Sequence, residues 1–218
     1  MCAGKCRLTS RVPSILLHAG FSSGLSRPFT VQNKQAGQSM RESTKPADIL
    51  EVHALPRDRT KGLLRCGSIT VPCALGRSGI ITRKREGDGA TPTGTFELLH
   101  VYYRADKGRT PQTVLPLEVL KPELGWCDDP GHPRYNRLVN LPFQASHEKM
   151  WRDDRLYDIV VVLDCNMYPP VKGKGSAIFF HVAREDYRPT EGCVAVAPHH
   201  MRLILSKVSP GCQMEIRS

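Results

Sequence analysis

The chain has 218 residues, which is enough for one domain with a hydrophobic core of its own. Its 18 glycines, 17 prolines and low aromatic content favour strands and turns over a helical bundle. The net charge of +10 would fit a nucleic-acid-binding protein. However, more than half of this excess comes from residues 1–41, which contain basic residues and no acidic one. The rest of the chain carries an ordinary excess for a globular domain, which weakens the nucleic-acid interpretation.

The first part of the chain differs in composition from the remainder. Residues 1–45 are rich in Ser, Gly, Lys and Arg and predict a disordered basic arm, unless Met40 is the true start of the protein. Their apolar run, ILLHAGF, is interrupted by His18 and is short for a secretory signal peptide. The chain has no window of about 20 apolar residues, so we expect no membrane-spanning helix. We therefore assign the fold to residues 46–218.

Short apolar runs separated by Gly, Pro and Asp begin near Asp48. The segment 63–76, LLRCGSITVPCALG, predicts two strands around a Gly-Ser turn, and GTFELLHVYYR at 94–104 predicts another strand. Residues 105–155 are broken by prolines and predict loops, with a short helix at SHEKMWRDD, 146–154. The continuous apolar run in LYDIVVVLD, 156–164, predicts a strand buried on both faces.

The last part of the chain predicts strands and one helix. GSAIFFHVA, 175–183, is expected to be a strand, and CVAVA, 193–197, a short strand or the entry to a helix. Pro198 suits the first position of a helix whose apolar face comprises Met201, Ile204, Leu205 and Val208. CQMEIR, 212–217, then forms a closing strand. The expected fold is a mostly-β domain with a late helix.

One cysteine and one histidine are candidates for catalysis. The eight cysteines of the chain show no CxxC and no zinc-type spacing, and their scatter favours reduced thiols over a disulfide scaffold. Cys193 follows His181 across a polar loop, and an imidazole can take the proton of a nucleophilic thiol. Gly192 permits close approach of the backbone, so that the amides of Gly192 and Cys193 can face an oxyanion. A backbone carbonyl can fix the tautomer of His181 through Nδ1–H.

Two other interpretations of this pair stay open. Cys193 can be a small core residue with a satisfied histidine near it in sequence. Alternatively, a metal ion can bind to His181, Cys193, His199 and His200, but adjacent histidines on a helix point in different directions, which ranks this below catalysis. We predict no metal and no cofactor.

Two motifs carry a resemblance to a known family. HVAREDYRPTEGCVAV, 181–196, resembles the signature of the YkuD-type L,D-transpeptidases, in which a histidine precedes a Ser/Thr-x-Gly-Cys element. GATPTGTFEL, 89–98, is similar to the Thr-Pro-x-Gly-x-Phe turn of the same family. The resemblance covers roughly residues 62–217. It implies, for residues 46–218, a catalytic domain built as a β-sandwich or barrel with a late helix packed on it, and without a separate peptidoglycan-binding domain.

The resemblance also implies an activity. Family members cut a peptidoglycan tetrapeptide stem after its meso-diaminopimelyl residue, expel D-alanine and pass the acyl group to an amine through a cysteine thioester. Mapped onto this chain, Cys193 is the nucleophile and His181 the general base. Gly192 and Cys193 supply oxyanion amides, and Thr190 braces the loop. The implied partners are donor and acceptor stem peptides, which places the protein in the periplasm or cell envelope. The absence of a convincing signal peptide leaves the cytoplasm open.

Other polar residues have weaker claims on the site. Tyr187 and Arg188 can contact the stem peptide, and Arg184 can pair with its carboxylate, but each also fits a solvated loop. Asn166 suits either the cleft or a turn. Asp128 and Asp129 fit a turn or cap, and Arg83, Lys84 and Arg85 fit a solvated hairpin tip.

The sequence departs from the family pattern at three positions, and the interval from His181 to Cys193 is shorter than in many members. Val182 follows the histidine where glycine is frequent, Glu191 precedes Gly-Cys where histidine is frequent, and no arginine follows Cys193 shortly. These differences leave the handling of the substrate's carboxylates open. Three rivals remain: an L,D-carboxypeptidase or hydrolase with the same Cys–His pair, a wall-binding module without catalysis, and a nucleic-acid-binding protein that uses residues 1–41.

Overall fold

The computed structural model describes residues 46–218. The predicted arm, residues 1–45, and its alternative start at Met40 lie outside the described residues. The described part contains fourteen strands and one helix: β1 (Ala47–Leu55), β2 (Asp58–Cys66), β3 (Ile69–Ala74), β4 (Ile80–Ile81), β5 (Thr91–Pro92), β6 (Gly94–Tyr103), β7 (Leu117–Val119), β8 (Leu124–Cys127), β9 (Arg137–Asn140), β10 (His147–Lys149), β11 (Ile159–Leu163), β12 (Phe179–Val182), β13 (Val194–Val196), α1 (Pro198–Leu205) and β14 (Val208–Arg217).

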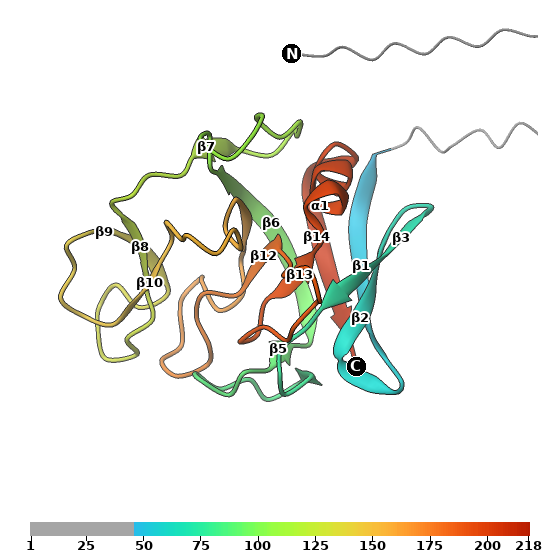
Figure 1. Ribbon diagram of the computed structural model, residues 1–218. Helices are drawn as coiled ribbons and strands as arrows, with labels where there is room; N and C mark the ends of the chain where they lie inside the picture. Colours follow the sequence, from blue (N-terminus) through green and yellow to red (C-terminus); the bar gives the residue numbers. More distant parts are fainter. Residues whose placement is uncertain (1–45) are drawn as a thin grey trace, which may run out of the picture. The chain divides into compact units, whose positions relative to one another are not determined.

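The main sheet of the described residues closes into a barrel. Its strand order is β11-β12-β13-β3-β2-β1-β14-β6-β7, and β11 also pairs with β6, which joins the two sides (Figure 1). A three-stranded sheet, β10-β8-β9, lies beside the barrel, and β4 and β5 form a two-stranded one. The expected fold class, mostly β with a late helix, is confirmed.

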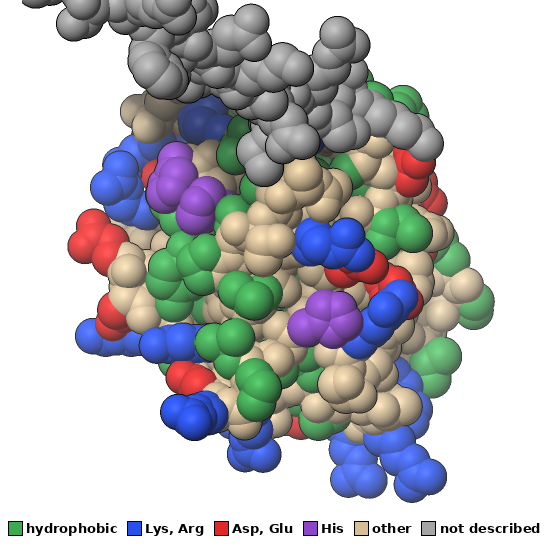
Figure 2. Space-filling view, turned by 90° about the vertical axis from the view of Figure 1, so that its right-hand side faces the viewer, with side chains coloured by type: hydrophobic (Ala, Val, Ile, Leu, Met, Phe, Trp, Pro, Cys, Tyr) green, Lys and Arg blue, Asp and Glu red, His purple; other side chains and the backbone are tan. Residues whose placement is uncertain are grey.

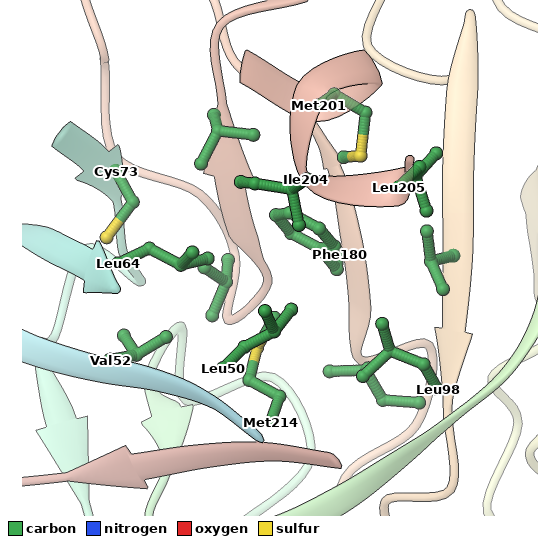
Figure 3. Packing of buried hydrophobic residues seen from close by; sticks show 14 of the residues in the cluster. Leu50, Val52, Leu64, Cys73, Leu98, Phe180, Met201, Ile204, Leu205 and Met214 are labelled. Atoms are coloured by element: carbon green, nitrogen blue, oxygen red, sulfur yellow. The ribbon is translucent and has the colours of Figure 1, made fainter. Parts of the chain in front are cut away.

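The predicted buried elements fill the barrel. Every residue of β11 is buried, as its continuous apolar run predicts. The helix α1 begins at Pro198, and Figure 3 shows its Met201, Ile204 and Leu205 pointing toward Phe180 in the core. Burying each such side chain stabilises the fold by about 1.5–3 kcal/mol. The helix is thereby fixed at the end of β13, the strand that follows Cys193.

Two local predictions differ from the structure, and one strand was not predicted at all. Residues 147–149 form the strand β10 instead of a helix, because Glu148 and Lys149 pair with β8. The helix α1 ends at Leu205, and Val208 is buried in β14 instead of on the helix. The strand β1 was not predicted, and it lies between parallel β14 and antiparallel β2. In each case a partner distant in sequence decides the local structure.

Two further features bear on function. The six cysteines of the described residues are all free and buried. Among the same residues, no helix is long and apolar enough to cross a membrane.

Candidate active site

Cys193 and His181 lie on the same face of two neighbouring parallel strands. In the register of β12 and β13, His181 pairs with Ala195 and Phe180 pairs with Val194. Phe180 and Val194 point into the barrel core, so the alternate positions, which include His181 and Cys193, point to the opposite face. Both side chains line one cleft of about 680 Å³. The structure therefore brings the predicted nucleophile and base together.

The imidazole of His181 is oriented by a backbone carbonyl. Its Nδ1 lies 2.9 Å from the carbonyl oxygen of Val182. A carbonyl oxygen only accepts, so Nδ1 carries the hydrogen and Nε2 of the neutral ring keeps its lone pair. The ring of Tyr157 stands edge-on at a centroid distance of 5.3 Å. Burial lowers the pKa of His181 to about 4, because the charged ring would lose its hydration. His181 is thus neutral at pH 7, with a lone pair on Nε2.

The thiol of Cys193 is held by backbone groups that precede and begin β12. The amide of Phe179 donates to Sγ at 3.3 Å, and the thiol donates to the carbonyl oxygen of Ala177 at 3.3 Å. The side chain is buried among Trp126, Tyr157 and other apolar groups. Burial raises the pKa of Cys193 to about 12, since a thiolate in this setting lacks water. Both members of the pair are therefore uncharged before substrate binds.

Thr190 braces the loop in front of the cysteine. Its hydroxyl donates to the carbonyl oxygen of Cys193 at 2.7 Å and accepts from the amide of Gly192 at 3.1 Å. The bracing expected of Thr190 is thus observed. We expected the amide of Gly192 to face an oxyanion. In the structure this amide donates to the Thr190 hydroxyl instead. That amide can serve an oxyanion only if the bond to Thr190 opens.

The loop is anchored to the segment that follows β3. Gly76 and Thr190 form a parallel bridge, in which the amide of Arg77 donates to the carbonyl oxygen of Thr190 at 2.9 Å. The amide of Gly76 in turn donates to Oγ1 of Thr91 at 2.8 Å. Thr91 belongs to the motif 89–98. The two motifs of the sequence therefore meet around this bridge.

The weaker candidates divide into two groups. Arg184 and Arg188 line the cleft, although each also faces an aspartate: Arg184 lies 3.8 Å from Asp154, and Arg188 lies 2.6 Å from Asp186. Tyr187 is not among the residues that line this cleft, and it packs instead against a cluster of small side chains, Ala74, Ala183 and Ala195.

Asn166 lies in a turn and not in the cleft, the two positions that the sequence left open for it. Its amide nitrogen donates to the carbonyl oxygens of Val171 at 3.0 Å and Gly175 at 2.8 Å, and its oxygen accepts from the amide of Val171 at 2.8 Å. It does not line the cleft. The prediction that it contacts substrate is therefore replaced by a role in shaping the loop before β12.

Lys84 is buried, although the sequence predicted that it would lie in a solvated hairpin tip with Arg83 and Arg85. Arg83 and Arg85 are exposed, but Lys84 is 9% exposed and lines the cleft. Its ammonium donates to Oδ1 of Asp88 at 2.5 Å and to the carbonyl oxygen of Arg85 at 3.0 Å. A buried ammonium needs such partners, and the loop supplies them. The only signal in the sequence was the acidic residue four positions later.

A polar network that the sequence did not reveal forms one wall of the cleft. Glu86 accepts from Ser176 Oγ at 2.9 Å and from the hydroxyl of Tyr135. Asp128 also lines the cleft, and its buried Oδ1 has no partner among the described residues. The turn or cap expected of Asp128 does not account for this atom. Asp129 fits its expected turn, because it accepts from the amide of Gly131 at 2.8 Å.

Asn136 supports the floor of the site. It is 1% exposed, and its oxygen accepts from Trp126 Nε1 at 2.9 Å and from the amide of Ala177 at 3.1 Å. Its nitrogen donates to the carbonyl oxygens of Cys165 and Asn166 at 3.0 and 2.8 Å. Ala177 is the residue whose carbonyl accepts from the Cys193 thiol, so Asn136 helps to position this thiol indirectly.

The metal interpretation finds no matching arrangement. No group of three or more His, Cys, Asp or Glu side chains within the described residues is placed to hold a metal ion. The rings of His199 and His200 lie 4.0 Å apart on α1, and neither lines the cleft with His181 and Cys193.

The described residues thus form a closed barrel with a buried cysteine and a buried histidine in one cleft. The family model of the YkuD L,D-transpeptidase catalytic domain matches residues 59–216. The chain therefore belongs to this family of L,D-transpeptidase catalytic domains. No curated protein and no solved structure matches the chain.

Proposed function

We propose that the protein is a cysteine acyltransferase that cross-links peptidoglycan tetrapeptide stems, with Cys193 as nucleophile and His181 as general base. The observation that carries the proposal is that both side chains face one cleft, with His181 Nε2 left as the proton acceptor. A nucleophile and an oriented base are the two groups that acyl transfer requires. The substrate implies a location in the periplasm or cell envelope.

The reaction proceeds in two halves. Sγ of Cys193 attacks the carbonyl carbon of the diaminopimelyl–D-alanine bond while its proton passes to Nε2 of His181. The C–N bond then breaks, the leaving amine of D-alanine takes that proton, and a thioester remains. In the second half, the acceptor amine attacks the thioester, and its proton returns through His181 to the sulfur as the C–S bond breaks. The thioester stores the acyl group, so no ATP is needed.

The neutral state of the pair before substrate binding fits this scheme. A separated thiolate and imidazolium would be costly in a buried site, so proton transfer accompanies attack on the carbonyl instead of preceding it. The charge that develops then lies on the tetrahedral oxygen. We expect the amide of Cys193 to stabilise it, since the amide of Gly192 donates to the Thr190 hydroxyl.

The test is the intact mass of the full chain after incubation with a disaccharide-tetrapeptide. We expect an adduct heavier than the protein by one disaccharide-tripeptidyl group, absent from Cys193→Ala. Cys193→Ser keeps little turnover, since a hydroxyl is a weaker nucleophile than a thiol near neutral pH. Full activity of Cys193→Ala would overturn the assignment. Adding an acceptor stem then separates cross-linking from the L,D-carboxypeptidase alternative, because water and amine compete for one thioester.

The two other rivals are tested differently. A wall-binding module without catalysis predicts no adduct on folded protein. Alkylation of Cys193 does not decide this, because burial raises the pKa of Cys193, as it does for Cys73, Cys165 and Cys212, to about 12. The nucleic-acid interpretation rests on residues 1–41, which lie outside the described residues. On the face drawn in Figure 2, basic and acidic side chains are interspersed with hydrophobic and uncharged ones.

A further inference from the structure

We propose that Arg77 binds the C-terminal carboxylate of the donor stem, an inference that rests on the function proposed above. The strand after Cys193 cannot supply this contact. Its residues, Val194–Val196, are all buried, and none is basic. A tetrapeptide stem that ends in D-alanine carries a free carboxylate next to the bond that is cut, so the cleft needs a cation from elsewhere.

The backbone of Arg77 is fixed to the loop that carries Cys193. Its amide donates to the carbonyl oxygen of Thr190 at 2.9 Å, and the amide of Thr190 donates to the carbonyl oxygen of Leu75 at 2.9 Å. Thr190 also holds the carbonyl oxygen of Cys193. The position of Arg77 relative to the nucleophile is therefore set by main-chain hydrogen bonds, although the two residues are far apart in sequence.

The guanidinium of Arg77 is held on one edge and open on the other. Its Nε donates to Oε2 of Glu191 at 2.8 Å, and its Nη2 donates to the carbonyl oxygen of Gly87 at 3.3 Å. It lies against Gly89, where an added Cβ would be 2.5 Å from its Cζ, so a side chain at position 89 would displace the guanidinium. Nη1 donates to no group in the described part of the chain, and the residue lines the cleft.

The remaining cations of the cleft are less suited to this role. Lys84 is buried and bound to Asp88. All three nitrogens of the Arg152 guanidinium donate to the carboxylates of Glu148 and Asp154. Arg188 is paired with Asp186. Arg184 is the cation of the cleft most similar to Arg77 in exposure, since its side chain is 48% exposed and that of Arg77 is 51% exposed.

Arg77 and Arg184 reach the cleft from different segments of the chain. Arg77 is attached to the loop before Cys193, whereas Arg184 follows β12 beyond His181. Glu191 does not compete strongly with a substrate carboxylate, since its own side chain is 78% exposed and screened by water. It occupies one edge of the Arg77 guanidinium and orients the other, a geometry that suits carboxylate recognition. The glutamate that precedes Gly192 thus acquires a positioning role.

The experiment compares two donors, a tetrapeptide stem with a free C-terminal carboxylate and the same stem as its C-terminal amide. kcat and KM are measured for the full chain, Arg77→Gln, Arg77→Lys and the matched control Arg184→Gln. We expect the unaltered protein to prefer the carboxylate. Arg77→Gln lowers kcat/KM for the carboxylate donor by about 10- to 100-fold and lowers it little for the amide, because a charged hydrogen bond is lost. Arg77→Lys keeps part of the preference.

The control variant distinguishes the charge of Arg77 from general disturbance of the cleft. Arg184→Gln leaves the ratio between the two donors as it is in the unaltered protein. If Arg77→Gln lowers kcat/KM for both donors by the same factor, the residue is structural and the proposal is overturned. Loss of the preference in Arg184→Gln also overturns it. Absence of turnover and of a Cys193 adduct in the unaltered protein is a separate result, which overturns the proposed function as well.

Discussion

Gly192 and Ala90 approach so closely that a Cβ at position 192 would lie 2.8 Å from the carbonyl oxygen of Ala90. Gly192 also has a φ of +137°, a conformation that residues with side chains rarely adopt. Ala90 belongs to the motif 89–98, and Gly192 precedes Cys193. The contact therefore joins the two motifs and accounts for glycine at this position.

Replacing Gly192 by alanine is expected to lower the free energy of unfolding by about 2–4 kcal/mol, because backbone strain and the contact with Ala90 act together. Urea denaturation measures the loss. The matched control is Gly173→Ala, since Gly173 has a φ of +73° and nothing within 4 Å of an added Cβ. That control costs about 1 kcal/mol from backbone conformation alone. Equal losses in both variants would contradict the role of the contact.

Thr190→Val replaces the hydroxyl of Thr190 with a methyl group of similar size. Two hydrogen bonds are lost, one to the Cys193 carbonyl and one from the Gly192 amide. We expect the free energy of unfolding to fall by about 1–3 kcal/mol and kcat to fall with it. Thr190→Ser keeps the hydroxyl and restores most of both. A valine variant with the kcat of the unaltered protein would show that the loop needs no brace.

Asn136→Leu leaves four partners, three backbone groups and one indole, without their hydrogen bonds to the amide. We expect a loss of about 3 kcal/mol or more in the free energy of unfolding, because the buried groups among them keep no partner. kcat also falls, since Ala177 no longer holds the thiol of Cys193 in place. Thermal denaturation and steady-state kinetics measure the two effects. The exposed Asn140, changed to alanine, serves as the control and stays within about 0.5 kcal/mol.

Stability is expected to depend on pH through His181. The pKa of its buried ring is lowered to about 4, whereas in the unfolded chain it is about 6.5. Between these values the unfolded state binds a proton that the folded state does not, so the free energy of unfolding falls as the pH drops from about 6.5 to about 4. The contribution amounts to about 3 kcal/mol, since one pKa unit corresponds to about 1.4 kcal/mol, and it is flat below that range. His181→Gln does not titrate, and its unfolding curve lacks this part of the slope. An unchanged slope would place the proton elsewhere.

The extent to which the sequence predicted the structure follows from the range of the interactions. The apolar run of β11 and the proline that begins α1 are local signals, and both elements form where expected. Cys193 and His181 were found through a motif, and the parallel pairing of β12 and β13 explains why a loop brings them to one face.

What the sequence did not reveal depends on distant segments. Lys84 turns inward because the loop folds back and supplies Asp88 and a carbonyl. Arg77 enters the cleft through a bridge to Thr190, a residue from the other end of the domain. The strand β10 forms only because β8 offers an edge. No periodicity or composition reports these pairings.

The burial of Cys193 also bears on its redox chemistry. Oxidants attack the thiolate form of accessible cysteines, and here the residue is 7% exposed and its thiol is protonated at neutral pH. Peroxide and small disulfides are consequently expected to react slowly with it. The fold thus keeps Cys193 in the thiol form that the proposed function requires.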